Sequence, residues 1–189
     1  MQEQHTTIQT ADGAMNTFVT CPEEGGPHPV VIFYMDAPGK REELHDMARR
    51  IASVGYYVVL PNLYYRDVSE FHLGMPNATR ERMFELMSNL SNALVCEDTR
   101  AILGFLKGEE SASDGPVGAV GYCMSGPFVF AVAAEFPDRI KASASLHGVR
   151  LFVDEDTSPH LTADKIQGEI YFGCAETDDW APPEMVEKL

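Results

Sequence analysis

One segment near the middle of the 189-residue chain constrains the fold more than any other. Residues 117–122 form an uninterrupted apolar run that predicts a buried β-strand, and the apolar stretch up to residue 134 predicts a helix packed on it. Between them, Gly121 and Ser125 stand two positions before and two positions after Cys123. This spacing of small residues is typical of a sharp strand–turn–helix junction that lifts one side chain above the end of a sheet.

Cys123 is the predicted nucleophile of this junction. We expect the following helix, which starts near Met124, to direct its N-terminus at the sulfur and favour the thiolate. The Met124 amide would be free to stabilise an oxyanion. Two alternatives stay open: Cys123 is also compatible with a small buried core residue, and Ser125 is an alternative nucleophile with poorer flanking residues. We expect the other cysteines to be structural, namely Cys21, Cys96 and Cys174.

Apolar runs alternate with helical patterns along the rest of the chain, which predicts an α/β fold with a mostly parallel sheet. Residues 6–9 and 15–21 predict an opening hairpin around an Asp-Gly turn. The further strands are predicted at residues 30–35, 56–60, 117–122, 140–146 and 169–173. Helical patterns lie at residues 44–52, 79–90, 97–106 and 124–134, whereas residues 62–79 and 108–116 are predicted to be irregular.

Composition narrows the class of partner. A net charge of −15 argues against nucleic acid and anionic membranes, since such a surface repels phosphate groups. No apolar run approaches the roughly 20 residues of a membrane span, and the N-terminus lacks the order of a signal peptide. Four scattered cysteines without zinc-like spacing indicate a reducing, cytoplasmic location, and no sequence motif indicates a metal or another cofactor.

Two loops are predicted to join Cys123 at the carboxyl edge of the sheet. The strand at residues 169–173 runs into an acidic segment in which Asp178 and Asp179 compete as the acid that orients a catalytic histidine. A plain solvated acidic loop is the alternative. The loop after residues 30–35 is expected to supply the second oxyanion amide from about Asp36 or Ala37. The Asp36 carboxylate would contact the thiol there, or else simply begin the next helix.

The chain resembles the dienelactone hydrolases from about residue 5 to its last residue. The motifs that carry the resemblance are GYCMSG at 121–126, DMARRIASVGYYVVLPNLYYR at 46–66, SLHG at 145–148 and AETDDWAPPEMVEKL at 175–189. The resemblance implies an α/β-hydrolase-type fold, with a mostly parallel sheet flanked by helices.

The resemblance also implies an activity, the opening of lactones and small esters by a Cys-His-Asp triad through an acyl-thioester. Cys123 then takes the place of the nucleophile, Met124 that of the oxyanion amide, and Asp178, four residues before Pro182, that of the acid. Asp36 stands where some members carry a glutamate that touches the resting thiol. An aspartate is one carbon shorter.

Members of the family also bind a substrate carboxylate with an arginine, for which Arg80 and Arg82 are equal candidates here. Their catalytic histidine follows the acid by a few tens of residues, whereas this sequence stops at Leu189. We therefore expect a single domain over residues 1–189 that lacks its last helix and strand. His147, at the end of a predicted strand, is the nearest substitute base, and the other five histidines are predicted to be on the surface.

The sequence thus predicts a hydrolase that cleaves a lactone or small ester through Cys123. The alternative function is a non-catalytic binding or redox-sensing protein that keeps the pocket and a reactive thiol. An amidotransferase-like fold, which also places a cysteine in such a turn, is a third and weaker hypothesis that depends on His147. The sequence does not predict an oligomeric state.

Overall fold

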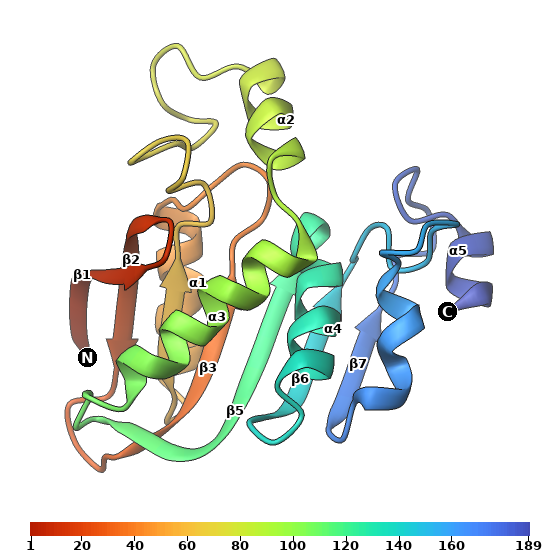
Figure 1. Cartoon of the computed structure of the whole chain (residues 1–189). Helices are drawn as coiled ribbons and strands as arrows, with labels where there is room; N and C mark the ends of the chain where they lie inside the picture. Colours follow the sequence, from red (N-terminus) through yellow and green to blue (C-terminus); the bar gives the residue numbers. More distant parts are fainter.

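The computed structural model describes residues 1–189 and contains one seven-stranded sheet in the order β1-β2-β4-β3-β5-β6-β7 (Figure 1). β1 and β2 form an antiparallel hairpin, β2 pairs antiparallel with β4, and the remaining neighbours are parallel. The strands are β1 Gln2–Thr10, β2 Gly13–Cys21, β3 His28–Tyr34, β4 Tyr57–Pro61, β5 Ala112–Tyr122, β6 Ile140–Leu146 and β7 Glu169–Gly173. The predicted fold class is confirmed.

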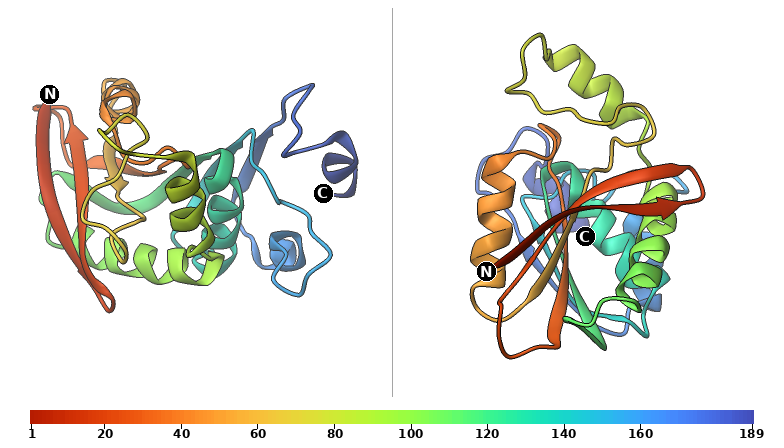
Figure 2. Two further views of the ribbon diagram at one scale, coloured as in Figure 1. Left: turned by 90° about the horizontal axis from the view of Figure 1, so that it is seen from above. Right: turned by 90° about the vertical axis from the view of Figure 1, so that its left-hand side faces the viewer.

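Helices cover the sheet on both faces (Figure 2). α1 (Glu42–Ala52) packs on one face against β2 and β4, while α3 (Asn92–Leu106) and α4 (Gly126–Glu135) lie on the other. A 3-10 helix, Pro159–Lys165, packs on α4, and the short α5 (Pro183–Lys188) lies beyond β7. α2 (Arg80–Ser88) and the irregular residues 62–79 stand above the carboxyl ends of the parallel strands.

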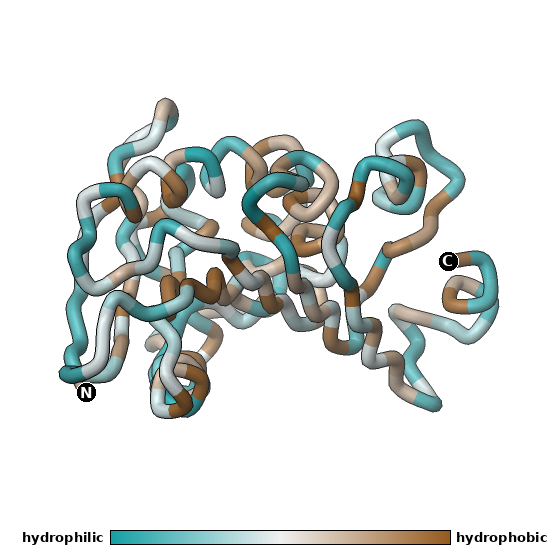
Figure 3. Tube along the Cα trace, turned by 90° about the horizontal axis from the view of Figure 1, so that it is seen from below, coloured by the Kyte–Doolittle hydropathy of each residue, from teal (hydrophilic) through white to brown (hydrophobic).

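The hydrophobic pattern explains these elements. All five residues of β4 are buried, as expected for a central strand with both faces covered. On α1, Leu44, Ala48 and Ala52 recur at helical spacing and are buried against the sheet. Hydrophobic residues are concentrated toward the middle of the molecule, whereas several loops at its periphery are hydrophilic (Figure 3).

Several predicted boundaries differ from the structure, and the starts of β5 and α3 differ most. β5 begins at Ala112, inside the segment predicted to be a loop, because His28 pairs with Ala112 before the ladder shifts register at Val30. α3 begins at Asn92 rather than at residue 97, since the Ser91 hydroxyl accepts a hydrogen bond from the Leu94 amide at 3.2 Å.

A surface hollow of about 510 Å³ lies on the α1 side of the sheet over β3, β5 and β6. Its lining is mostly apolar and includes Val31, Val120, Tyr122 and Ala144. Cys123 is not part of this lining. No helix of the protein has the length and apolar character needed to cross a membrane.

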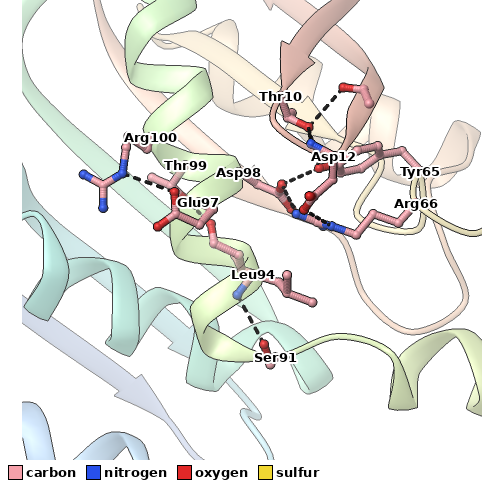
Figure 4. A network of polar contacts seen from close by, with 12 residues as sticks. Thr10, Asp12, Tyr65, Arg66, Ser91, Leu94, Glu97, Asp98, Thr99 and Arg100 are labelled. Atoms are coloured by element: carbon pink, nitrogen blue, oxygen red, sulfur yellow. Dashed lines mark hydrogen bonds and ion pairs between the residues drawn. The ribbon is translucent and has the colours of Figure 1, made fainter.

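A buried carboxylate ties the segment after β4 to the helical layer (Figure 4). Asp98 on α3 is fully buried and accepts hydrogen bonds from the Arg66 guanidinium at 2.7 and 3.0 Å and from the Tyr65 hydroxyl at 2.8 Å. The same two residues reach the β1–β2 turn, where Arg66 pairs with Asp12 and the Tyr65 hydroxyl lies 2.7 Å from the Thr10 hydroxyl. The network therefore fixes the start of the irregular segment.

We predict that Asp98→Ala lowers the free energy of unfolding by about 3 kcal/mol, because it leaves a mostly buried guanidinium and a phenol without their shared acceptor. Urea denaturation measures the loss. Glu97→Ala is the matched control on the same helix. Glu97 is 60% exposed and pairs with Arg100 at the surface, so its removal should cost less than about 1 kcal/mol. Equal losses in the two variants would contradict the assignment.

Candidate active site

Cys123 occupies a strained turn between β5 and α4. Its φ angle is +52°, a value that a non-glycine residue adopts only when its surroundings enforce it. A single 3-10 turn, Cys123–Ser125, connects the strand to α4. Gly121 is required here, because a Cβ at that position would lie 2.5 Å from the Ser125 carbonyl oxygen. The predicted strand–turn–helix junction is confirmed.

The loop that follows β6 packs directly on this turn. A Cβ on Gly126 would come within 2.3 Å of the Gly148 Cα, so the two backbones touch where α4 begins. The Val149 amide donates to the Cys123 carbonyl at 3.1 Å. His147, just before them, has a φ of +41° and donates its amide to the Gly173 carbonyl of β7 at 2.6 Å. The SLHG motif therefore supports the turn through its backbone.

Ser125 faces away from solvent. Its side chain is fully buried, and its hydroxyl donates a short hydrogen bond to the Met35 carbonyl at the end of β3. A hydroxyl that is buried and already donating is poorly placed to attack a substrate. This geometry argues against the alternative in which Ser125 is the nucleophile, and it joins the turn to the neighbouring strand.

Asp36, the residue after Met35, is held by an arginine. The Arg41 guanidinium binds the Asp36 carboxylate through two contacts, at 2.5 and 3.0 Å, and both side chains are about one-fifth exposed. Arg41 immediately precedes α1. No hydrogen bond joins Asp36 to the Cys123 sulfur, so the structure places the carboxylate on Arg41 rather than on the thiol.

The two candidate oxyanion residues are buried beside one another. Ala37 is 6% exposed and Met124 is 4% exposed. The Tyr64 hydroxyl donates to the Ala37 carbonyl at 2.7 Å and lies 3.5 Å from the Met124 sulfur, so one side chain contacts both residues. The Ala37 amide donates no hydrogen bond within the protein. It is a free donor at the carboxyl edge of the sheet.

Asp178 lies on the loop after β7. One carboxylate oxygen accepts a hydrogen bond from the Trp180 amide at 2.8 Å, and the residue is half-buried, whereas Asp179 is exposed. The Trp180 indole, 64% exposed, extends toward α2, where its ring centroid is 6.1 Å from that of Phe84. Of the two competing acids, Asp178 is therefore the one turned toward the protein.

The electrostatic setting of Cys123 differs from the sequence expectation. Burial raises the pKa of the thiol above its usual value, and the negative charges of Asp36 and Asp178 raise it further. A hydrogen bond from the Met124 amide lowers the pKa but does not outweigh burial. The amide at the start of the helix thus favours the thiolate, as the sequence predicted, but burial and the two carboxylates outweigh it, so the pKa of the thiol is raised overall.

No histidine contacts the thiol or the acid. His147 is exposed, and its ring lies 5.7 Å from the ring of Tyr122 without making a hydrogen bond. The expectation of five surface histidines fails at His28, which is 6% exposed at the start of β3. The structure does not bring His147 together with Cys123 and Asp178 as a base would require.

The structure also places the other cysteines and the two candidate arginines. Cys21 and Cys96 are buried, in line with a structural role, but Cys174 is exposed on the loop that carries Asp178. Arg82 is paired with Glu85 at 2.7 Å on the surface of α2. Arg80, the first residue of that helix, is exposed, so neither arginine is distinguished as a carboxylate-binding residue. No cluster of His, Cys, Asp or Glu has an arrangement that could hold a metal ion.

Sequence reasoning missed Tyr64 and the tie between Ser125 and Met35. Tyr64 is part of the segment LPNLYYR, but nothing in the order of residues says which of two adjacent tyrosines faces the Cys123 turn. In the structure, Tyr64 turns to Ala37 and Tyr65 turns to Asp98.

Comparison with known proteins gives similarity along the whole chain. A protein of Methylorubrum extorquens is 31% identical over 143 residues, which are 75% of this chain and 47% of that protein. A Synechocystis protein is 29% identical over 188 residues, 96% of this chain and 76% of its own length. The "Carboxymethylenebutenolidase" of Pseudomonas putida is 28% identical over 131 residues, 68% of this chain and 55% of that enzyme. The chain thus spans about half the length of several curated relatives.

Solved structures agree with the fold. A crystal structure of a Klebsiella pneumoniae protein has a TM-score of 0.85 at 23% identity, covering 98% of this chain and 77% of the other. A dienelactone hydrolase-like phosphotriesterase from metagenomic libraries has a TM-score of 0.76 at 18% identity, covering 99% of this chain and 74% of the other. The model of the "Dienelactone hydrolase family" matches residues 15–189. With that match over nearly all of its length and an α/β-hydrolase fold in support, the chain belongs to the dienelactone hydrolase family.

Proposed function

We propose that this chain forms the nucleophile-bearing part of a hydrolase that cleaves a lactone or small ester through an acyl-thioester on Cys123. The observation that carries the proposal is the strained turn, with Cys123 at a φ of +52° between β5 and α4, in a member of the dienelactone hydrolase family. The substrate class follows from the family and from the name of the Pseudomonas putida relative, since a butenolide is a lactone.

In the proposed reaction the Cys123 thiolate attacks the carbonyl carbon of the substrate. Negative charge that develops on the carbonyl oxygen is stabilised by the amides of Met124 and Ala37. The carbon–oxygen bond to the leaving alkoxide then breaks, the alkoxide takes up a proton, and an acyl-thioester remains. Water hydrolyses the thioester to the carboxylic acid and restores the thiol.

The acid of this mechanism is Asp178, which is half-buried and fixed by the Trp180 amide. The family assigns its proton transfers to a histidine, and the exposed His147, without a contact to Cys123 or Asp178, does not meet that requirement. Cys123 and the amides of Met124 and Ala37 therefore support the acylation step of the proposed reaction. Alkaline pH can supply the thiolate that acylation needs.

A redox-sensing function for the same thiol is less well supported. Sensor cysteines combine a low pKa with exposure and often have a resolving cysteine beside them. Burial raises the pKa of Cys123, and all four cysteines are unpaired.

The direct test is acylation with p-nitrophenyl acetate at about pH 9, where a larger share of the thiol is ionised. We expect a burst of p-nitrophenolate and an acetyl group on Cys123 in the intact and peptide masses. Cys123→Ala should lose the burst and keep its urea midpoint, whereas Cys174→Ala, which removes the exposed cysteine, should keep the burst. Acetylation confined to Cys174 would contradict the proposal.

A second prediction concerns pH. Because the Asp36 charge raises the pKa of Cys123, Asp36→Asn should lower that pKa and move the midpoint of iodoacetamide labelling to lower pH. Release of Arg41 acts in the same direction. Glu43→Gln is the control: Glu43 also pairs with Arg41, at 3.4 Å, but is 74% exposed and should leave the midpoint unchanged. A higher pH midpoint in Asp36→Asn would contradict the prediction that the Asp36 charge raises the pKa of Cys123.

A further inference from the structure

The loop after β3 is held at every carbonyl from Met35 to Pro38. Two of the donors are backbone amides: Gly39 donates to Asp36 at 3.0 Å, and Leu73 donates to Pro38 at 2.9 Å. The other two are side-chain hydroxyls from distant parts of the chain. Ser125 donates to the Met35 carbonyl, and Tyr64 donates to the Ala37 carbonyl at 2.7 Å.

These contacts fix the direction of the Ala37 amide. A trans peptide is planar and its N–H points opposite to its C=O, so the bond from Gly39 to the Asp36 carbonyl orients the Ala37 N–H away from Gly39. The peptides on either side are held by Ser125 and Tyr64. With both neighbours fixed, the φ and ψ angles of Asp36 and Ala37 have little freedom, and the unused Ala37 donor is preorganised.

Tyr64 is suited to hold this loop. Its ring is fully buried and packs edge-on against Phe71, with the ring centroids 6.0 Å apart. Burial raises the pKa of the phenol and the nearby charge of Asp36 raises it further, so the hydroxyl stays protonated and keeps donating. Its own amide donates to the Asn62 side chain at 3.1 Å, which fixes the backbone from which the ring extends.

The same hydroxyl lies 3.5 Å from the sulfur of Met124. Tyr64 therefore contacts the side chain of Met124, in the turn after β5, and the carbonyl of Ala37, in the loop after β3. Ser125 makes a second connection between the same two loops, since it belongs to the turn and donates to the end of β3. The two hydroxyls hold the β3 loop from opposite sides of Asp36.

We propose that Tyr64 and Ser125 are positioning residues that set the Ala37 amide against the Met124 amide as a two-donor oxyanion hole. Neither side chain touches the substrate. Each acts through a carbonyl of the loop after β3. Removal of either hydroxyl would let the peptide bonded to it rotate, and the Ala37 N–H would no longer point toward the oxyanion. The inference rests on the proposed acyl-thioester function, because only an acyl transfer develops an oxyanion at these amides.

The test compares two reactions of the same thiol in the full 189-residue chain. Acetylation of Cys123 by p-nitrophenyl acetate passes through an oxyanion, whereas alkylation by iodoacetamide does not. We expect Tyr64→Phe, which keeps the ring, to slow acetylation about tenfold or more. The rate of alkylation should stay within about twofold of wild type, and the pH midpoint of alkylation should not change. Ser125→Ala should give the same split.

Tyr65→Phe is the matched control. It also removes a mostly buried phenol hydroxyl, one bonded to Asp98 instead of Ala37, so it should lower the urea midpoint without slowing acetylation. If Tyr64→Phe does not fold, as judged by urea denaturation, Ser125→Ala decides the question.

Acetylation at the wild-type rate in the deciding variant would overturn the inference. An equal slowing of both reactions would also overturn it, because that result indicates a loss of thiol reactivity. Failure of the wild-type chain to be acetylated at all would instead contradict the proposed function itself.

Discussion

Three backbone segments approach one another closely around Cys123: the end of β5, the start of α4 and the loop after β6. The rest of the site depends on this constraint. Gly121 passes the Ser125 carbonyl at a distance that excludes a Cβ, and Gly126 meets Gly148 in the same way. The first contact forces the turn that gives Cys123 its positive φ, and the second presses the loop after β6 onto the start of α4. Such strain persists only where the surroundings over-determine the conformation, and here the parallel ladders of β3, β5 and β6 do so.

Much of the fold could be predicted because local pattern and tertiary role agree. The strands predicted at residues 140–146 and 169–173 are observed as β6 and β7 with the same bounds, since Pro137 and Gly148 flank the first and Gly168 precedes the second. The start of β5 could not be predicted in this way. Residues 112–116 carry the turn-like sequence Ala-Ser-Asp-Gly-Pro, and they join the sheet only through a pairing with His28 that no local pattern shows.

The candidate site shows the same division. The junction at Cys123 has a local signature, namely small residues at fixed spacing between two apolar elements. The electrostatic environment of the Cys123 sulfur has no such local signature. The sequence indicated a helix N-terminus that would favour the thiolate, but the pKa of Cys123 also reflects burial and two carboxylates that arrive from β3 and β7. Likewise, Tyr64 and Tyr65 are adjacent and chemically identical, and only the fold gives one to Ala37 and the other to Asp98.

The raised pKa of Cys123 is compatible with a nucleophile if the proton acceptor becomes cationic. Both Asp36 and Asp178 raise the pKa of Cys123, but Asp36 is paired with Arg41, whereas Asp178 has no cationic partner. A lone thiolate is disfavoured beside such a charge, but an ion pair of a thiolate and a protonated base is not, since the same carboxylate stabilises the cation. In the proposed mechanism, the raised pKa would keep the thiol neutral at rest, and the Asp178 carboxylate would stabilise the cation that forms when the base takes up the proton. In the same mechanism, the oxyanion would be stabilised by the uncharged amides of Met124 and Ala37.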